Sequence, residues 1–132
     1  MVNHSLIALA ALTCVSAALA QPAAAAVHGF SFRAAEFMDD DKALAEAQAF
    51  LATQEPKGLP MADAARRLSE ADMYCKPLRG AADGSQDCSF AMMAGGDGGT
   101  LGKDIWAVRL RSDGQGRLAV AGLNHDRIDF HP

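Results

Sequence analysis

The sequence has few basic residues, few aromatic residues and few cysteines, and each shortage narrows what the protein can be. Lys and Arg total 12 and Asp and Glu total 16 in 132 residues, which gives a net charge of −4. Proteins that bind nucleic acid carry a basic face, so we expect no nucleic-acid partner. A chain of this length has room for one domain only.

Sequence motifs of the common enzyme classes are also missing. The glycine-rich stretch at 94–102 fails as a phosphate-binding loop, which would need glycine at Asp97 and a hydroxyl residue at Asp104. The same stretch is similar to one calcium-binding nonapeptide of a parallel β-helix, but such nonapeptides work as stacked repeats and this chain has a single copy. No G-x-S-x-G nucleophile motif occurs. We therefore expect a protein that is not an enzyme and needs no cofactor.

The first 26 residues contain no Asp, Glu, Lys or Arg and have the pattern of a secretory signal peptide. An apolar run from Leu6 to Leu19 leads to an A-x-A pattern that predicts cleavage after Ala20, with a second possible site after Ala26. Retention of this segment as a membrane anchor is the alternative. The remainder, 27–132, is expected to be a single periplasmic or secreted domain that does not span a membrane.

The three cysteines divide between these two parts of the chain. Cys14 lies in the apolar run, either as a lipid-attachment residue or as a small residue in a segment that is removed. Cys75 and Cys88 remain in the domain, and an even pair in an exported chain predicts one disulfide.

Two helices are expected in the first half of the domain. The first spans Asp39–Thr53, with an apolar stripe at Ala43, Leu44, Ala47, Phe50 and Leu51. The second follows Pro60, with a stripe at Met61, Ala64, Ala65, Leu68 and Ala71. It should end at Asp72 in a left-handed conformation, which Asp tolerates. The alternating Phe30 and Phe32 suggest a short extended arm that precedes both helices.

The second half of the domain has the pattern of antiparallel strands. The expected strands are Met73–Leu78, Cys88–Met93, Asp104–Arg111, Arg117–Leu123 and a short last one at Ile128–Phe130. Leu118 and Val120 should share a face, and Asn124–Arg127 should form a turn. We therefore predict an α+β domain (ααββββ) with two N-terminal helices on one face of a three- to five-stranded antiparallel sheet.

Candidate binding residues are few, and each has a simpler structural interpretation. Tyr74 and Trp106 could line a groove, although a tryptophan on an alternating strand is typical of a core. His125, Asp129 and His131 are weak candidates for a metal site near the C-terminus, where the simpler interpretation is an exposed polar tail. On balance we expect no metal.

The order of helices and strands, with Gly58-Leu59-Pro60 opening the second helix, resembles the small envelope proteins of the BamE (SmpA/OmlA) type. Their fold is β-lactamase-inhibitor-like. The segments GLPMADAARRL and IWAVRLRSDGQGRLAV carry the resemblance, which extends from Asp39 to Leu123. It implies the fold above and a role in the cell envelope.

The expected function is therefore a non-catalytic one. The protein would bind another envelope protein through the exposed face or an edge strand of its sheet. One alternative is an enzyme inhibitor that presents the loop Arg79–Asp87 to a cleft. Another is a metal or small-ligand binder that uses the C-terminal His/Asp cluster.

Overall fold

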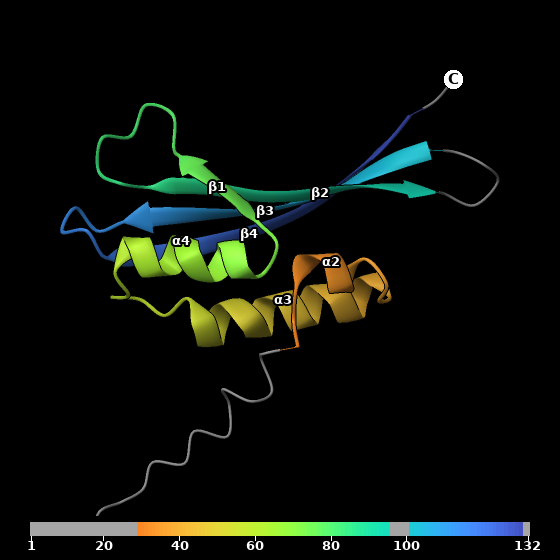
Figure 1. Ribbon diagram of the computed structural model, residues 1–132, viewed down its shortest axis with the longest axis horizontal. Coiled ribbons are helices and arrows are strands. Elements are labelled where there is room, and N and C mark those ends of the chain that lie inside the picture. The colour runs from red at the N-terminus through yellow and green to blue at the C-terminus, as the bar shows by residue number, and fades with distance from the viewer. Residues whose placement is uncertain (1–28, 96–100, 131–132) are drawn as a thin grey trace, which may run out of the picture.

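The computed structural model describes residues 29–95 and 101–130, in which helices cover one side of a twisted sheet (Figure 1). The helices are α2 (Phe32–Ala35), α3 (Asp40–Gln54) and α4 (Met61–Glu70). The strands are β1 (Tyr74–Pro77), β2 (Gln86–Gly95), β3 (Leu101–Ser112) and β4 (Leu118–Asp129). All neighbouring strands are antiparallel in the order β1-β2-β3-β4, which confirms the α+β class and the antiparallel sheet.

The hydrophobic core lies between the helices and the sheet. The largest fully buried side chains are those of Trp106, Phe32, Leu68, Leu110, Leu118 and Val108. Small residues on the helices, such as Ala47 and Ala64, are completely buried and allow close packing. Among the helices that the structure describes, none has the length and apolar character needed to cross a membrane.

The two long helices follow the predicted boundaries within one or two residues. In α3 the predicted stripe is buried except for Leu44, which is 39% exposed because it lies at the margin of the buried face. Helix α4 begins directly after Pro60, as expected. After α4, Asp72 has a φ of 72°, which confirms the predicted left-handed residue.

The segment around Phe32 is helical, so the prediction of an extended arm was wrong. The Ser31 hydroxyl accepts a hydrogen bond of 3.0 Å from the Ala34 backbone N–H and caps the short helix α2. The helical turn buries Phe32 completely, against Phe30, Phe50 and Trp106. Glu36 follows directly as the last residue of this turn.

The strands alternate as predicted on β2 and β3, but β4 differs in two ways. It runs unbroken through Asn124–Arg127, so the expected turn and separate last strand were wrong. A bulge opposite Arg111 and Ser112 places Leu118 in the core and leaves Val120 55% exposed, although the two were expected on one face. As a result, His125 points toward the helices.

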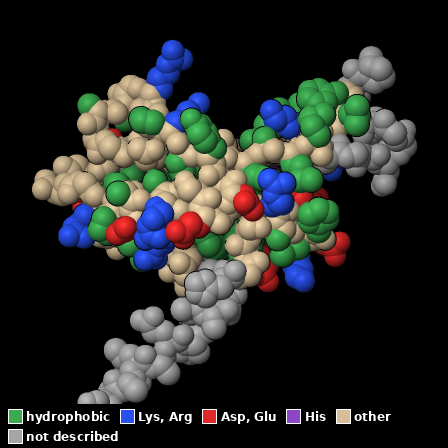
Figure 2. Space-filling model, viewed as in Figure 1, with side chains coloured by type: hydrophobic (Ala, Val, Ile, Leu, Met, Phe, Trp, Pro, Cys, Tyr) green, Lys and Arg blue, Asp and Glu red, His purple; other side chains and the backbone are tan. Residues whose placement is uncertain are grey.

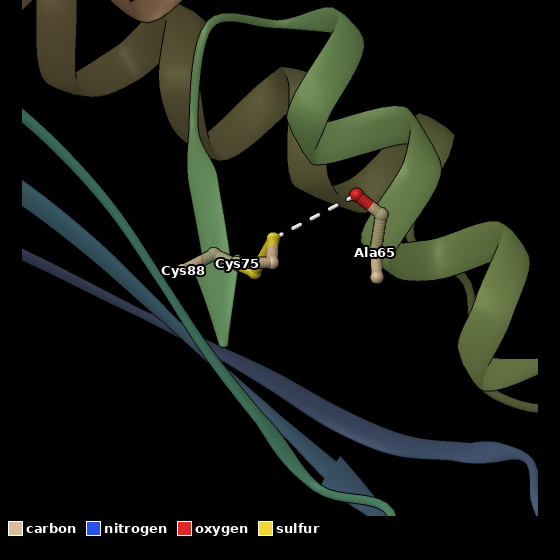
Figure 3. Close-up of a disulfide and its surroundings, with 3 residues drawn as sticks. All are labelled: Ala65, Cys75 and Cys88. Carbon is tan, nitrogen blue, oxygen red and sulfur yellow. Dashed lines mark hydrogen bonds between the residues drawn. A yellow bond between two sulfur atoms is a disulfide. The ribbon is translucent and has the colours of Figure 1, made fainter. Parts of the chain in front are cut away.

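The predicted disulfide joins Cys75 and Cys88, which lie directly opposite each other on β1 and β2 with Cα atoms 4.0 Å apart. Figure 3 shows the bond beneath α4, with the Cys75 sulfur 3.7 Å from the carbonyl oxygen of Ala65. This is a packing contact, because an oxidised sulfur carries no hydrogen. The bond ties the short edge strand β1 to its neighbour β2.

Candidate functional site

The two aromatic residues proposed for a groove lie on opposite sides of the sheet. Tyr74 is 73% exposed on the side turned away from the helices, which we call the open face. Trp106 is 1% exposed and lies in the core between the sheet and α2. The two side chains therefore do not line one groove.

The predicted C-terminal metal candidates are separated as well. The Asp129 carboxylate accepts a hydrogen bond from Arg127 and is exposed to solvent. His131 lies outside the described residues. His125 points to the helix side, where it meets Asp104 of β3 and Glu36 at the end of α2.

Glu36, Asp104 and His125 form what we call the acid–histidine cluster. One ligand atom from each residue lies within 4.8 Å of the other two. His125 Nε2 is 3.9 Å from Asp104 Oδ1. The group lines a cavity of about 10 Å³, which has room for about one water molecule or one ion.

Trp106 fixes the geometry of this cluster from the side of the hydrophobic core. Its ring stacks on His125 with centroids 3.8 Å apart and an interplanar angle of 7°. Its indole N–H donates a hydrogen bond of 2.9 Å to Glu36 Oε1. One side chain therefore orients both the imidazole and one carboxylate.

The carboxyl group of Glu36 is electrostatically unusual. Burial, and then a hydrogen bond with Asp104, raise its pKa from 4.5 to about 7. The Trp106 N–H and the charge of Arg127 act in the opposite direction. Two acids in contact favour a shared proton or a bound cation.

A second buried acid, Glu55, lies in a groove between α3 and β4. The groove has a volume of about 280 Å³ and is lined by Gln48, Leu51, Ala52, Glu55, Ala121 and Leu123. Burial raises the Glu55 pKa to about 8, with a smaller opposing effect from Arg67. Neither Glu55 oxygen has a hydrogen-bond partner among the described residues.

The open face carries a group of apolar side chains at one end, which we call the distal patch: Met93, Leu101, Ile128 and Phe130. Their exposed fractions run from 43% to 60%. Met93 and Ile128 lie on either side of Lys103 in the strand register, and the Phe130 N–H donates to the Leu101 carbonyl. Figure 2 shows hydrophobic side chains gathered at this end of the sheet.

The loop between β1 and β2, proposed as an inhibitory element, has a fixed base. The Leu78 N–H donates to the Ser85 carbonyl, and the Asp83 carboxylate accepts from the Ser85 N–H. The disulfide clamps the strands below it. Figure 1 shows the loop projecting from the end of the sheet opposite the distal patch.

Sequence reasoning missed Glu36 and Asp104 as partners of His125. Asp104 offered one signal, since it occupies an inward position of the alternating strand two residues before Trp106. Glu36 offered none, because α2 was not expected. Comparison with protein-family models, with curated proteins and with solved structures finds no match to this chain.

Proposed function

We propose that this protein is a non-catalytic binding module of the cell envelope, and that its distal patch contacts another envelope protein. The signal-peptide pattern and the Cys75–Cys88 disulfide support a location outside the cytoplasm, where disulfides persist. The helix-covered antiparallel sheet is compatible with the BamE-type resemblance.

The distal patch is the observation that carries this proposal. Met93, Leu101, Ile128 and Phe130 are all large and at least 43% exposed, and they gather on one side of one sheet end. Full burial of such a side chain contributes about 1.5 to 3 kcal/mol. A contiguous apolar surface of this kind typically marks a protein-interaction site.

The adjacent edge of β4 suggests how a partner would bind. The α3–α4 connection pairs with the beginning of this strand, where Gly58 N–H donates to the Leu118 carbonyl and Leu118 N–H donates to the Leu59 carbonyl. Beside the distal patch, from Asp126 to Asp129, no described strand pairs with this edge of β4. An extended segment of the partner can add there by backbone hydrogen bonding.

Lys103 adds a charge requirement to this interface. It lies between Met93 and Ile128 in the register and forms no ion pair with any described residue. We propose an extended apolar segment of the partner with a carboxylate that faces Lys103. Such a pair would set the register of the added strand.

Site-specific photo-crosslinking tests the proposal. A photo-reactive residue at Leu101 should give an adduct with one envelope protein, whereas the same residue at Val120 should not. Val120 is 55% exposed and lies on the open face like Leu101, but at the opposite end of the sheet from the distal patch. It is therefore a matched control.

The affinity of the purified partner then gives the quantitative test. Leu101→Asp and Ile128→Asp should each weaken binding by about tenfold or more, since buried interface anchors contribute at this level. Val120→Asp should bind like the wild-type protein. Equal losses in all three variants, or none in the patch variants, would refute the proposed surface. A patch-dependent homodimer in light scattering would also contradict a heterologous partner.

A further inference from the structure

We propose that Glu36, Asp104 and His125 form a binding site for one divalent transition-metal ion of the class that includes Zn²⁺. The site differs from the C-terminal cluster considered from the sequence, since only His125 belongs to both. It is also separate from the distal patch, so the two proposals can fail independently.

The ligand atoms already converge from three separate elements. Glu36 directly follows α2, Asp104 lies on β3 and His125 lies on β4, yet one oxygen or nitrogen from each falls within 4.8 Å of the others. Zinc ligands lie about 2.0 to 2.2 Å from the ion, so atoms around one ion are about 3 to 3.6 Å apart. The existing 3.9 Å between His125 Nε2 and Asp104 Oδ1 needs only a small side-chain adjustment.

The nitrogen of His125 that faces the cluster lacks a partner. Nε2 is buried and forms no hydrogen bond with any described residue. A buried polar atom without a partner typically costs about 1 to 3 kcal/mol. Coordination of a metal ion through this nitrogen would satisfy it.

The charge balance of the cluster also favours a dication. Asp104 is 9% exposed, and the carboxyl group of Glu36 lies against it. Two carboxylates in contact repel each other when both are ionised. A divalent ion would neutralise both, and Trp106 leaves Glu36 Oε2 available because its N–H binds Oε1.

The ligand types select the class of metal. Calcium takes six to eight oxygen ligands and magnesium prefers oxygen and water, so an imidazole disfavours both. A set of one nitrogen and two carboxylate oxygens suits Zn²⁺ and its first-row neighbours. Asp40 also lines the cavity and could supply a fourth ligand in place of water.

The surroundings indicate a structural ion. Ala35, Met38 and Ala43 close the cavity, and its volume of about 10 Å³ leaves no space for a substrate beside a metal. Trp106 stacks on His125 and binds Glu36, as outer-shell residues of metal sites do. The ion would fasten α2 to β3 and β4.

Zinc titration of the purified, metal-stripped protein without an affinity tag tests the site. Calorimetry should give one ion per chain, and the fluorescence of Trp106, the sole tryptophan, should change over the same range. Asp104→Asn and Glu36→Gln keep the side-chain shape and should weaken Zn²⁺ binding at least tenfold. Circular dichroism should show that both variants fold.

Three controls make the result specific. Asp129→Asn and the double variant His28→Ala/His131→Ala should bind Zn²⁺ like the wild-type protein, and Ca²⁺ should not compete. Zinc should raise the wild-type Tm but not the Tm of Asp104→Asn. Absence of binding would overturn the proposal, as would binding that Asp104→Asn and Glu36→Gln leave unchanged or that His28→Ala/His131→Ala abolishes.

Discussion

Trp106 and His125 face each other directly across β3 and β4, with their rings stacked 3.8 Å apart and almost parallel. The same indole donates a hydrogen bond to Glu36, which comes from the other end of the domain's sequence. Trp106 is therefore both a core residue and the support of a polar cluster. A substitution there should have an electrostatic consequence in addition to a packing one.

Trp106→Phe should destabilise the protein more at high pH than at low pH. The smaller ring leaves a cavity, and the Glu36 carboxylate loses its N–H donor, so its pKa should rise further above about 7. We expect a loss of about 2 to 4 kcal/mol at pH 8, from the cavity and the lost hydrogen bond. Urea unfolding followed by circular dichroism measures the loss of stability at pH 4.5 and at pH 8.

Val108→Ala is the matched control for this prediction. Val108 is completely buried, two residues further along β3, and has no polar atom in its side chain. Its truncation should cost the same free energy at both pH values. If Trp106→Phe shows no more pH dependence than Val108→Ala, the hydrogen bond to Glu36 does not affect that carboxyl group.

Glu55 should make the protein less stable as the pH rises from about 4.5 to about 8. Its pKa is raised from 4.5 to about 8 in the folded state, so the folded protein holds a proton that the unfolded chain has lost. The contribution of Glu55 to the free energy of unfolding is fully present below about pH 4.5 and is lost progressively as the pH rises to about 8. Each pKa unit corresponds to about 1.4 kcal/mol, so the total is a few kcal/mol.

Glu55→Gln removes this titration and is the test. The variant should be more stable than the wild-type protein at pH 8, and its stability should change less between pH 5 and pH 8. Glu46→Gln is the control, since Glu46 is exposed on α3, the helix that Glu55 directly follows, and it should change neither quantity. An unchanged pH profile in Glu55→Gln would show that Glu55 is ionised in the folded protein.

Asp72 should resist replacement by residues with ordinary backbone preferences. Its φ of 72° lies in the left-handed region, which costs a residue with a β-carbon about 1 to 2 kcal/mol unless it is Asn or Asp. Asp72→Ala should therefore lose about 1 kcal/mol in thermal or urea unfolding. The stability of Asp72→Asn should stay within a few tenths of a kcal/mol of the wild-type value, because the ion pair that it removes, between Asp72 and Arg33, is exposed and long at 3.9 Å.

The sequence predicted those parts of the fold in which one periodic pattern dominates. The alternation of Trp106, Val108 and Leu110 predicted the buried face of β3, and proline and glycine predicted the break between α3 and α4. The opposed cysteines followed from the same alternation on β1 and β2. These signals are local, so they can be recognised without knowledge of the tertiary structure.

The errors arose where tertiary pairing overrides the local signal. Asn124–Arg127 is polar enough for a turn, but its backbone pairs with Asp104–Ala107 of β3 and continues the strand. The bulge before Val120 shifts the alternation by one residue, and nothing in the residues around it indicates where it falls. The acid–histidine cluster depends on both features and on α2, so it could not be derived from spacing.

The Cys75–Cys88 bond should stabilise the domain by about 3 kcal/mol, the chain-entropy value for a loop of this size. The two residues are separated by 13 positions, and Cys88 is 1% exposed, so a buried hydroxyl should be avoided in the test. The double variant Cys75→Ala/Cys88→Ala should therefore lose about this amount in urea unfolding. A reducing agent should lower wild-type stability similarly and leave the double variant unaffected.

Mass spectrometry of the unreduced protein provides the independent measurement for this bond. Protein purified from its cellular compartment should lack two hydrogens relative to the reduced form, and alkylation without reduction should label neither cysteine. Because the bond connects β1 to β2 beneath α4, its reduction should expose the β1 edge to hydrogen exchange before the β3–β4 pair. Two alkylated thiols in the native protein would contradict both the oxidised pair and the extracytoplasmic location that it supports.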